Sequence, residues 1–215
     1  MEIVWYGLSC FRMMERGLSS IVTDPYSPDL GLPALKLKAD IVTFSHDEPA
    51  SNSLKAVRGT RRTITGPGEY ELGGVFVTGV TMKKTEKNGK SNKSKPNTLY
   101  VFDFDGLTIA HLGDLSYVPS HAHIENLGAV NIALVPVGGG GALTPSQASE
   151  VISLIEPSIV IPMRYKTGEE TIKLGTVTRF LKEMGITSLD PLPSLKISKS
   201  SLSEETQVIL LEPMT

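Results

Sequence analysis

The stretch IVTFSHDEPAS, residues 41–51, joins an apolar run to a histidine and two acids. Residues 40–44 predict a buried β-strand, because Ile, Val, Thr and Phe pack well on a pleated surface. His46 and Glu48 follow this strand at its end, where a fold can hold polar side chains rigidly and still leave them open to a ligand. The stretch therefore predicts a ligand or metal site at the edge of a sheet.

Composition describes an ordinary globular protein. The 215 residues suffice for a single domain over residues 1–215, with 40% hydrophobic residues and a net charge of −2. This charge argues against nucleic acid as a partner, and no apolar run approaches the roughly 20 residues of a membrane span. The first residues lack the pattern of a signal peptide, so we expect a cytoplasmic protein. The single cysteine, Cys10, excludes an intrachain disulfide and a thiolate-rich zinc site, and we expect it to be buried.

The first half of the chain reads as short strands separated by turns. Runs rich in Val, Ile, Thr and aromatic residues predict strands at 2–6, 9–13, 19–23, 40–44, 61–65 and 74–80. The segment KKTEKNGKSNKSK at 83–95 has six lysines, one acid and no apolar residue. Because such a segment cannot bury anything, we expect a flexible lysine-rich loop over residues 83–97.

The second half alternates strands and helices. Strands are predicted at 98–104 and 107–111, joined by the tight turn of Asp105 and Gly106. Apolar runs at 131–137 and 158–163 predict strands that flank a helix at 144–155. Thr144 is a favourable N-cap residue for this helix, and Pro145 suits its first position. A second helix is expected at 171–184 and a last strand at 207–211. Strands followed by strand-helix-strand units predict a layered α/β architecture.

Seven landmarks, in this order, resemble the metallo-β-lactamase superfamily, and most closely its compact branch of metal-dependent hydrolases similar to L-ascorbate-6-phosphate lactonase. They are WYGLSCF at 5–11, TDPY at 23–26, TFSH at 43–46, GPGEYELGG at 66–74, HLGD at 111–114, PVGG at 136–139 and IPMRY at 161–165. The resemblance implies a four-layer αββα sandwich with the active site along one edge. The landmarks span nearly the whole chain, so the order is more specific than any one motif.

The family holds one or two zinc ions with a His-x-His-x-Asp-His loop, a later His, a bridging Asp and a final His. The first loop position matches His46, but the second falls on Glu48 and the remaining two fall on Ala50 and Ser51. The bridging acid is kept as Asp114. The resemblance therefore implies His46, Glu48 and Asp114 as the remaining candidate metal ligands.

Three other positions depart from the family pattern. The segment TMKK at 81–84 contains no later histidine, Leu8 stands where this branch often has another, and the final histidine is replaced by Arg164. A guanidinium cannot be deprotonated in a protein, and it repels a nearby metal cation. We therefore interpret Arg164 as a substitute for the charge of the metal, paired with Asp114 or Glu48.

Two functions are consistent with these residues. In the first, the dinuclear zinc site is lost and no metal cofactor is needed. The cleft with His46, Glu48, Asp114 and Arg164 is kept to bind a ligand, and the positive charge of Arg164 suggests that this ligand is an anionic small molecule. In the second, an active hydrolase of phosphoesters or lactones uses one Zn²⁺, Mn²⁺ or Mg²⁺ on His46, Glu48 and Asp114. A weaker third hypothesis is anion or nucleic-acid binding by the lysine-rich loop, with a steep dependence on salt.

The remaining histidines and the glycine run receive less specific interpretations. We expect His111 to support the site or to be structural, and His121 and His123 to be exposed although their spacing imitates a metal-binding pair. The run GGGG at 138–141 lacks the Lys-Ser/Thr ending of a P-loop. We expect it to let the backbone turn tightly beside the site.

Overall fold

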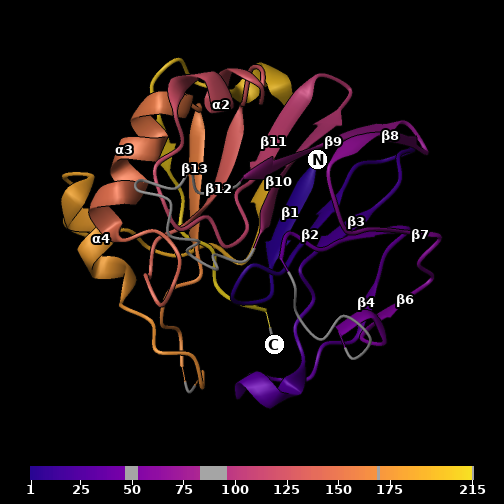
Figure 1. The fold of residues 1–215 in the computed structure, drawn as a ribbon, viewed down its shortest axis with the longest axis horizontal. Helices are drawn as coiled ribbons and strands as arrows, with labels where there is room; N and C mark the ends of the chain where they lie inside the picture. Colours follow the sequence, from indigo (N-terminus) through magenta and orange to yellow (C-terminus); the bar gives the residue numbers. More distant parts are fainter. Residues whose placement is uncertain (47–52, 83–95, 169, 215) are drawn as a thin grey trace, which may run out of the picture.

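The computed structural model describes residues 1–46, 53–82, 96–168 and 170–214. In this part of the chain two β-sheets pack against each other, and helices α2, α3 and α4 lie beside one of them (Figure 1). A small parallel pair, β4 (Leu37–Lys38) and β6 (Val57–Arg58), lies on the other side of the molecule. The predicted α/β sandwich is confirmed.

The first sheet has six strands in the order β14-β1-β2-β3-β5-β7. β3, β5 and β7 run parallel, so their carboxyl ends lie at the same edge. Polar residues that follow these strands can therefore meet there. The strands are β1 (Glu2–Trp5), β2 (Phe11–Met14), β3 (Ile21–Thr23), β5 (Ile41–Thr43), β7 (Arg62–Ile64) and β14 (Leu195–Lys196).

The second sheet has seven strands in the order β15-β13-β12-β11-β10-β9-β8, of which β11, β12 and β13 are parallel. Its strands are β8 (Gly68–Leu72), β9 (Val75–Met82), β10 (Asn97–Phe104), β11 (Leu107–His111), β12 (Ile132–Pro136), β13 (Ile159–Met163) and β15 (Gln207–Val208). The predicted hairpin between β10 and β11 is confirmed. Asp105 and Gly106 have φ values of 54° and 82°, as a tight two-residue turn requires.

The helices are α2 (His121–Glu125), α3 (Pro145–Ile155) and α4 (Val177–Glu183), with short 3-10 turns at η1 (Pro28–Leu30) and η2 (Lys199–Ser201). α3 begins as predicted, because Thr144 Oγ1 accepts a hydrogen bond from the backbone N–H of Gln147. The prediction that the next helix begins at residue 171 is wrong. The N–H groups of Thr171 and Gly175 donate to the carbonyls of Leu30 and Gly138 instead.

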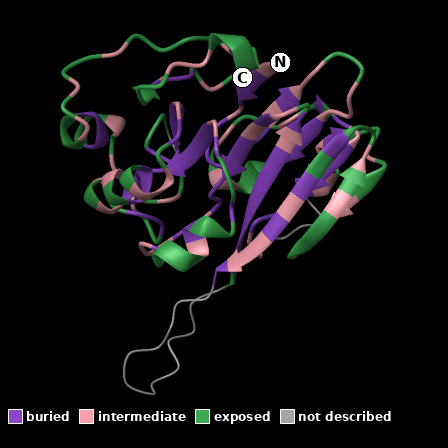
Figure 2. Ribbon diagram, turned by 90° about the horizontal axis from the view of Figure 1, so that it is seen from above, coloured by how far each residue is buried: buried purple, intermediate pink, exposed green. Residues whose placement is uncertain are grey.

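The core lies between the two sheets, where the buried residues of Figure 2 are concentrated. Trp5 and Phe11 from the first sheet and Tyr100 and Phe102 from the second are fully buried in one cluster. A second cluster covers the other face of the first sheet, with Cys10 packed among residues of the connecting loops and of β4 and β6. Cys10 is fully buried, as expected, and this burial raises the pKa of its thiol well above the ordinary value.

The lysine-rich segment lies outside the described residues as far as residue 95. Its predicted end at residue 97 is wrong, because Asn97 is the buried first residue of β10. Among the described residues, no helix has the length and apolar character needed to cross a membrane.

Candidate functional site

His46 lies just beyond the carboxyl end of β5, where its imidazole sits between two carboxylates. Its Nδ1 is 3.6 Å from Asp24 Oδ2, and its Nε2 is 3.9 Å from Asp114 Oδ2. Ser45 Oγ lies 2.8 Å from His46 Nδ1. Only 10% of the His46 side chain is exposed, so the structure places this residue in a protected polar cluster.

Asp24 is the site residue that the sequence reasoning missed. It follows β3, and because β3 and β5 are parallel neighbours, it meets Ser45 and His46 at the shared edge. Its buried carboxylate accepts hydrogen bonds from the Ser45 backbone N–H at 2.7 Å and from the Ser45 hydroxyl at 2.5 Å. An acid directly after an apolar strand was the available signal, the same pattern that identified the segment after β5.

Asp114 and Arg164 come from the second sheet and form the ion pair that the sequence predicts. Arg164 Nη2 lies 2.9 Å from Asp114 Oδ2, with 9% and 22% of the two side chains exposed. Asp114 follows β11 and Arg164 follows β13, and both strands run parallel to β12. Asn97 Oδ1 accepts a hydrogen bond from the Asp114 N–H at 2.8 Å and so fixes this turn. The third candidate ligand, Glu48, lies outside the described residues.

The backbone is strained where these segments meet. Leu8, Asp24 and Arg164 have φ values of 48°, 37° and 54°, in the left-handed region that side chains disfavour. The Arg164 N–H donates to the Leu8 carbonyl at 3.2 Å, which holds two of these residues together. Such conformations persist only where the surrounding structure enforces them, and they concentrate at functional sites.

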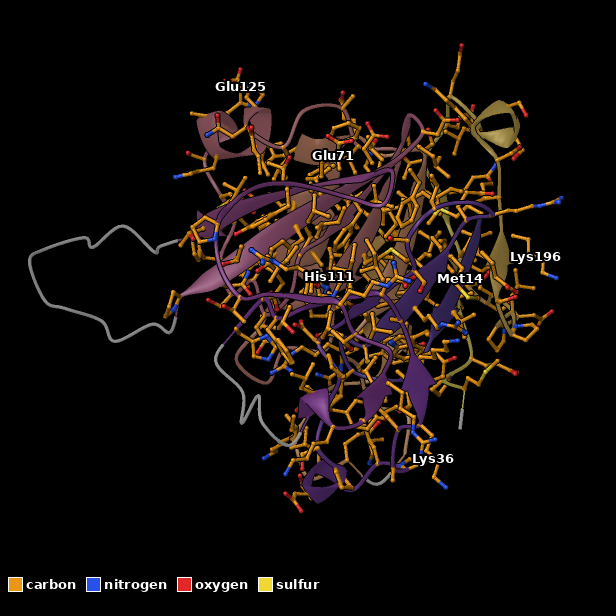
Figure 3. The ribbon with its side chains drawn as sticks, turned by 90° about the vertical axis from the view of Figure 1, so that its right-hand side faces the viewer. Met14, Lys36, Glu71, His111, Glu125 and Lys196 are labelled. Carbon is orange, nitrogen blue, oxygen red and sulfur yellow. The ribbon has the colours of Figure 1, made fainter. Side chains whose placement is uncertain are left out.

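His111 supports the site from the core, where Figure 3 labels it. Its Nε2 lies 2.9 Å from the Ser9 carbonyl oxygen, and because a carbonyl can only accept, Nε2 carries the proton. Burial lowers the pKa of His111, against the opposing effect of the Asp24 charge, so the ring is neutral near pH 7. These contacts agree with the expectation of a supporting or structural histidine.

His121 and His123 lie on α2 and are not part of this site. His121 Nε2 is 3.7 Å from Glu125 Oε1 on the helix surface, with 75% of the histidine side chain exposed. His123 Nδ1 is 2.8 Å from the hydroxyl of Ser120. His121 is exposed, as expected, whereas His123 is only partly exposed.

The glycine run passes beside the arginine, as the sequence predicts. A Cβ atom on Gly138 would lie 2.2 Å from the Arg164 carbonyl oxygen and 2.7 Å from the Tyr165 Cα. Only glycine permits this approach. The run therefore positions the backbone on which Arg164 sits.

A narrow pocket opens beside the polar cluster. The lining is mainly apolar, with Asp24, His46 and Arg164 as its charged or titratable members and Leu8, Ser9, Pro25, Tyr26, Leu30, Phe44 and Ile172 as the rest. This arrangement places the arginine as a hydrogen-bond donor at a narrow, mainly apolar pocket.

The described residues do not fit a zinc centre. Within the described ranges, no group of three or more His, Cys, Asp or Glu side chains could hold a metal ion. The carboxylate that would bridge two metals, Asp114, contacts a permanently charged guanidinium instead. A catalytic zinc needs about three protein ligands with an open position, and the described residues around Arg164 do not supply them.

Residues 2–164 match the family described as the Beta-lactamase superfamily domain. The chain also resembles a solved structure from Thermotoga maritima, described as a candidate Zn-dependent hydrolase of the metallo-β-lactamase superfamily. The two are 33% identical with a TM-score of 0.78, and 98% of each chain is covered. A second solved structure, Igni18, a metallo hydrolase of Ignicoccus hospitalis, is 18% identical to this chain with a TM-score of 0.63. The match covers 92% of this chain and 99% of Igni18, and at this identity it supports the fold but not the function.

Curated relatives are similar over most of their length. A UPF0173 protein of Pyrococcus abyssi is 29% identical over 182 residues, covering 78% of this chain and 84% of the relative. A UPF0173 metal-dependent hydrolase of Thermoplasma acidophilum is 26% identical over 191 residues, again covering 78% and 84%. The Thermoplasma acidophilum relative is thus described as a metal-dependent hydrolase, whereas the described residues of this chain place an arginine beside the retained acid.

Proposed function

Since the chain belongs to the β-lactamase superfamily, we propose that it is a member whose metal charge is supplied by Arg164 and whose cleft binds a small molecule without dinuclear zinc hydrolysis. The observation that carries this proposal is the contact of 2.9 Å between Arg164 Nη2 and Asp114 Oδ2. A cation is already present at the acid that would bridge two metals. Adding a divalent ion at about 4 Å from the guanidinium costs several kcal/mol of repulsion at an effective dielectric near 20.

The pocket beside the arginine supports a binding role. Arg164 Nε is buried and has no hydrogen-bond partner among the described residues, and the buried hydroxyl of Ser9 has none either. Buried donors are normally satisfied, so a ligand with acceptor oxygens would stabilise both groups. An anionic small molecule would offer such oxygens to Arg164.

A second candidate is an active hydrolase with one Zn²⁺, Mn²⁺ or Mg²⁺ on His46, Asp114 and Glu48, acting on a phosphoester or a lactone. The descriptions of the Thermotoga maritima and Thermoplasma acidophilum proteins favour it. In that case Arg164 would bind the anionic part of the substrate rather than replace the ion.

Metal analysis of protein purified without a polyhistidine tag distinguishes the two. After dialysis against Zn²⁺ or Mn²⁺ and removal of free ion, the first proposal predicts well below about 0.2 metal ions per chain. It also predicts no metal-stimulated turnover of a phosphodiester or a lactone. One bound ion per chain together with metal-dependent turnover would establish the second candidate and refute the first.

A further inference from the structure

Six exposed cationic residues gather in one region, away from the helices. We call them the basic patch; they are Lys36, Lys38, Lys55, Arg58, Arg61 and Arg62. Residues 36–62 contain these six cations and three acids, Asp40, Asp47 and Glu48, so the segment carries a charge of +3. The whole chain carries −2. The patch is therefore a local excess of positive charge on a weakly acidic protein.

The fold brings these side chains together from separate segments. β4 and β6 are parallel, and Lys38 is the register partner of Arg58, so their backbones lie about 4.8 Å apart. Arg61 Nε lies 3.6 Å from Asp40, two residues after β4. Figure 1 shows β4, β6 and β7 on the same side of the molecule, and Figure 3 shows Lys36 at its periphery.

The positive charge of the patch is not neutralised within the described part of the chain. Of the six cations, only Arg61 makes an ion pair there, and 84% of its side chain is exposed. Leu37 and Val57 anchor the two short strands by packing into the second hydrophobic cluster. The patch thus presents unpaired cations from a backbone that is held in place.

We propose that the basic patch binds the phosphate backbone of double-stranded nucleic acid without reading its sequence. Three of the six cations are arginines, whose planar guanidinium matches phosphate geometry. Among the described residues, no aromatic side chain is exposed between positions 36 and 62, so the patch offers no platform on which single-stranded bases could stack. The exposed large hydrophobic residues, Phe76, Leu192 and Met214, lie outside these positions, so the patch has no group to insert into a membrane.

This surface is separate from the candidate site. Arg62 begins β7, which runs parallel to β5, whereas His46 lies beyond the opposite, carboxyl end of β5. Binding at the patch therefore does not depend on the role of Arg164 or on any metal. The proposal differs from the expectation that the protein does not bind nucleic acid, which was drawn from the net charge. The net charge is a sum over the whole chain, so it does not show a local excess of cations on one surface.

The test is fluorescence anisotropy with a random-sequence DNA duplex of about 20 base pairs over about 50 to 200 mM salt. Five unpaired cations predict a slope of about −4.5 for the logarithm of the binding constant against the logarithm of salt concentration. The double variant Lys38→Gln, Arg58→Gln should weaken binding and make this slope shallower by about 1.8. The matched control Arg179→Gln, Lys182→Gln, exposed on α4, should leave the slope unchanged.

The proposal is overturned if the patch variant and the α4 control bind the duplex equally well. It is also overturned if binding is lost only when the six lysines of residues 83–95 are changed to glutamine, which would assign binding to that segment. Patch-dependent binding to anionic lipid vesicles, without binding to the duplex, would assign the surface to membranes instead. Circular dichroism of each variant confirms folding, which we expect to persist because the changed side chains are exposed.

Discussion

Replacing Arg164 with methionine tests the role of the ion pair in the site. Methionine keeps much of the length and apolar bulk of the side chain but removes its charge. The change takes away the guanidinium that lies 2.9 Å from Asp114 Oδ2. We expect the variant to be less stable and, at the same time, more receptive to a divalent cation.

The magnitude follows from the geometry. Two unit charges 2.9 Å apart attract by about 6 kcal/mol at an effective dielectric of 20, before the cost of removing both from water. Breaking a fully buried pair costs about 3–5 kcal/mol. Because 22% of the Asp114 side chain is exposed, water recovers part of that loss. We therefore expect the free energy of unfolding to fall by about 2 kcal/mol.

Urea denaturation measures this change, with Arg61→Met as the matched control. Arg61 also faces a carboxylate, at 3.6 Å from Asp40, but it is 84% exposed, so its loss should cost less than about 0.5 kcal/mol. A double-mutant cycle with Asp114→Asn should give a coupling energy of at least about 1 kcal/mol. Equal effects of Arg164→Met and Arg61→Met, or zero coupling to Asp114, would refute the reasoning.

Two further predictions concern the surrounding structure. Hydrogen bonds from the Ser20 N–H and hydroxyl lower the pKa of Asp40 below its ordinary 3.8. The ionised carboxylate therefore stabilises the folded state above that pH, and this stabilisation is lost as the pH falls through the folded-state pKa. Asp40→Asn should lower the free energy of unfolding by about 1 kcal/mol at pH 7, and denaturation curves should show the variant and the wild type becoming equally stable near pH 2. Gly138→Ala should lower the unfolding free energy by at least about 2 kcal/mol, because its Cβ would meet the Arg164 carbonyl oxygen at 2.2 Å, whereas Gly168→Ala, with open space around it, should be nearly neutral in the same assay.

The elements that the sequence predicts well are those with a strong local pattern. β5, β10 and β11 have runs of Val, Ile, Thr and aromatics, and Asp105 with Gly106 supplies the turn. β4 and β6 are two-residue strands that, among the described residues, pair with each other alone, so no periodicity could reveal them. α4 begins later than predicted because Thr171 and Gly175 donate their N–H groups to carbonyls that are distant in the sequence, which no local pattern reveals.

The sequence could identify some residues of the candidate site but not others. His46 follows a predicted strand, so the sequence pattern could identify it, whereas Asp114 and Arg164 were identified from the family resemblance. Asp24 was missed because its role depends on β3 lying beside β5, which only the sheet order establishes. The role of Glu48 stays a prediction because it lies outside the described residues.

Crystals of the tag-free protein soaked in Zn²⁺, with diffraction recorded on both sides of the zinc absorption edge, test the central claim most directly. If Arg164 supplies the charge of the ion, the anomalous map will show no zinc peak beside Asp114, and Nη2 will stay within hydrogen-bond distance of Oδ2. A zinc peak between His46 and Asp114, with the Arg164 side chain turned away from the carboxylate, would contradict the account.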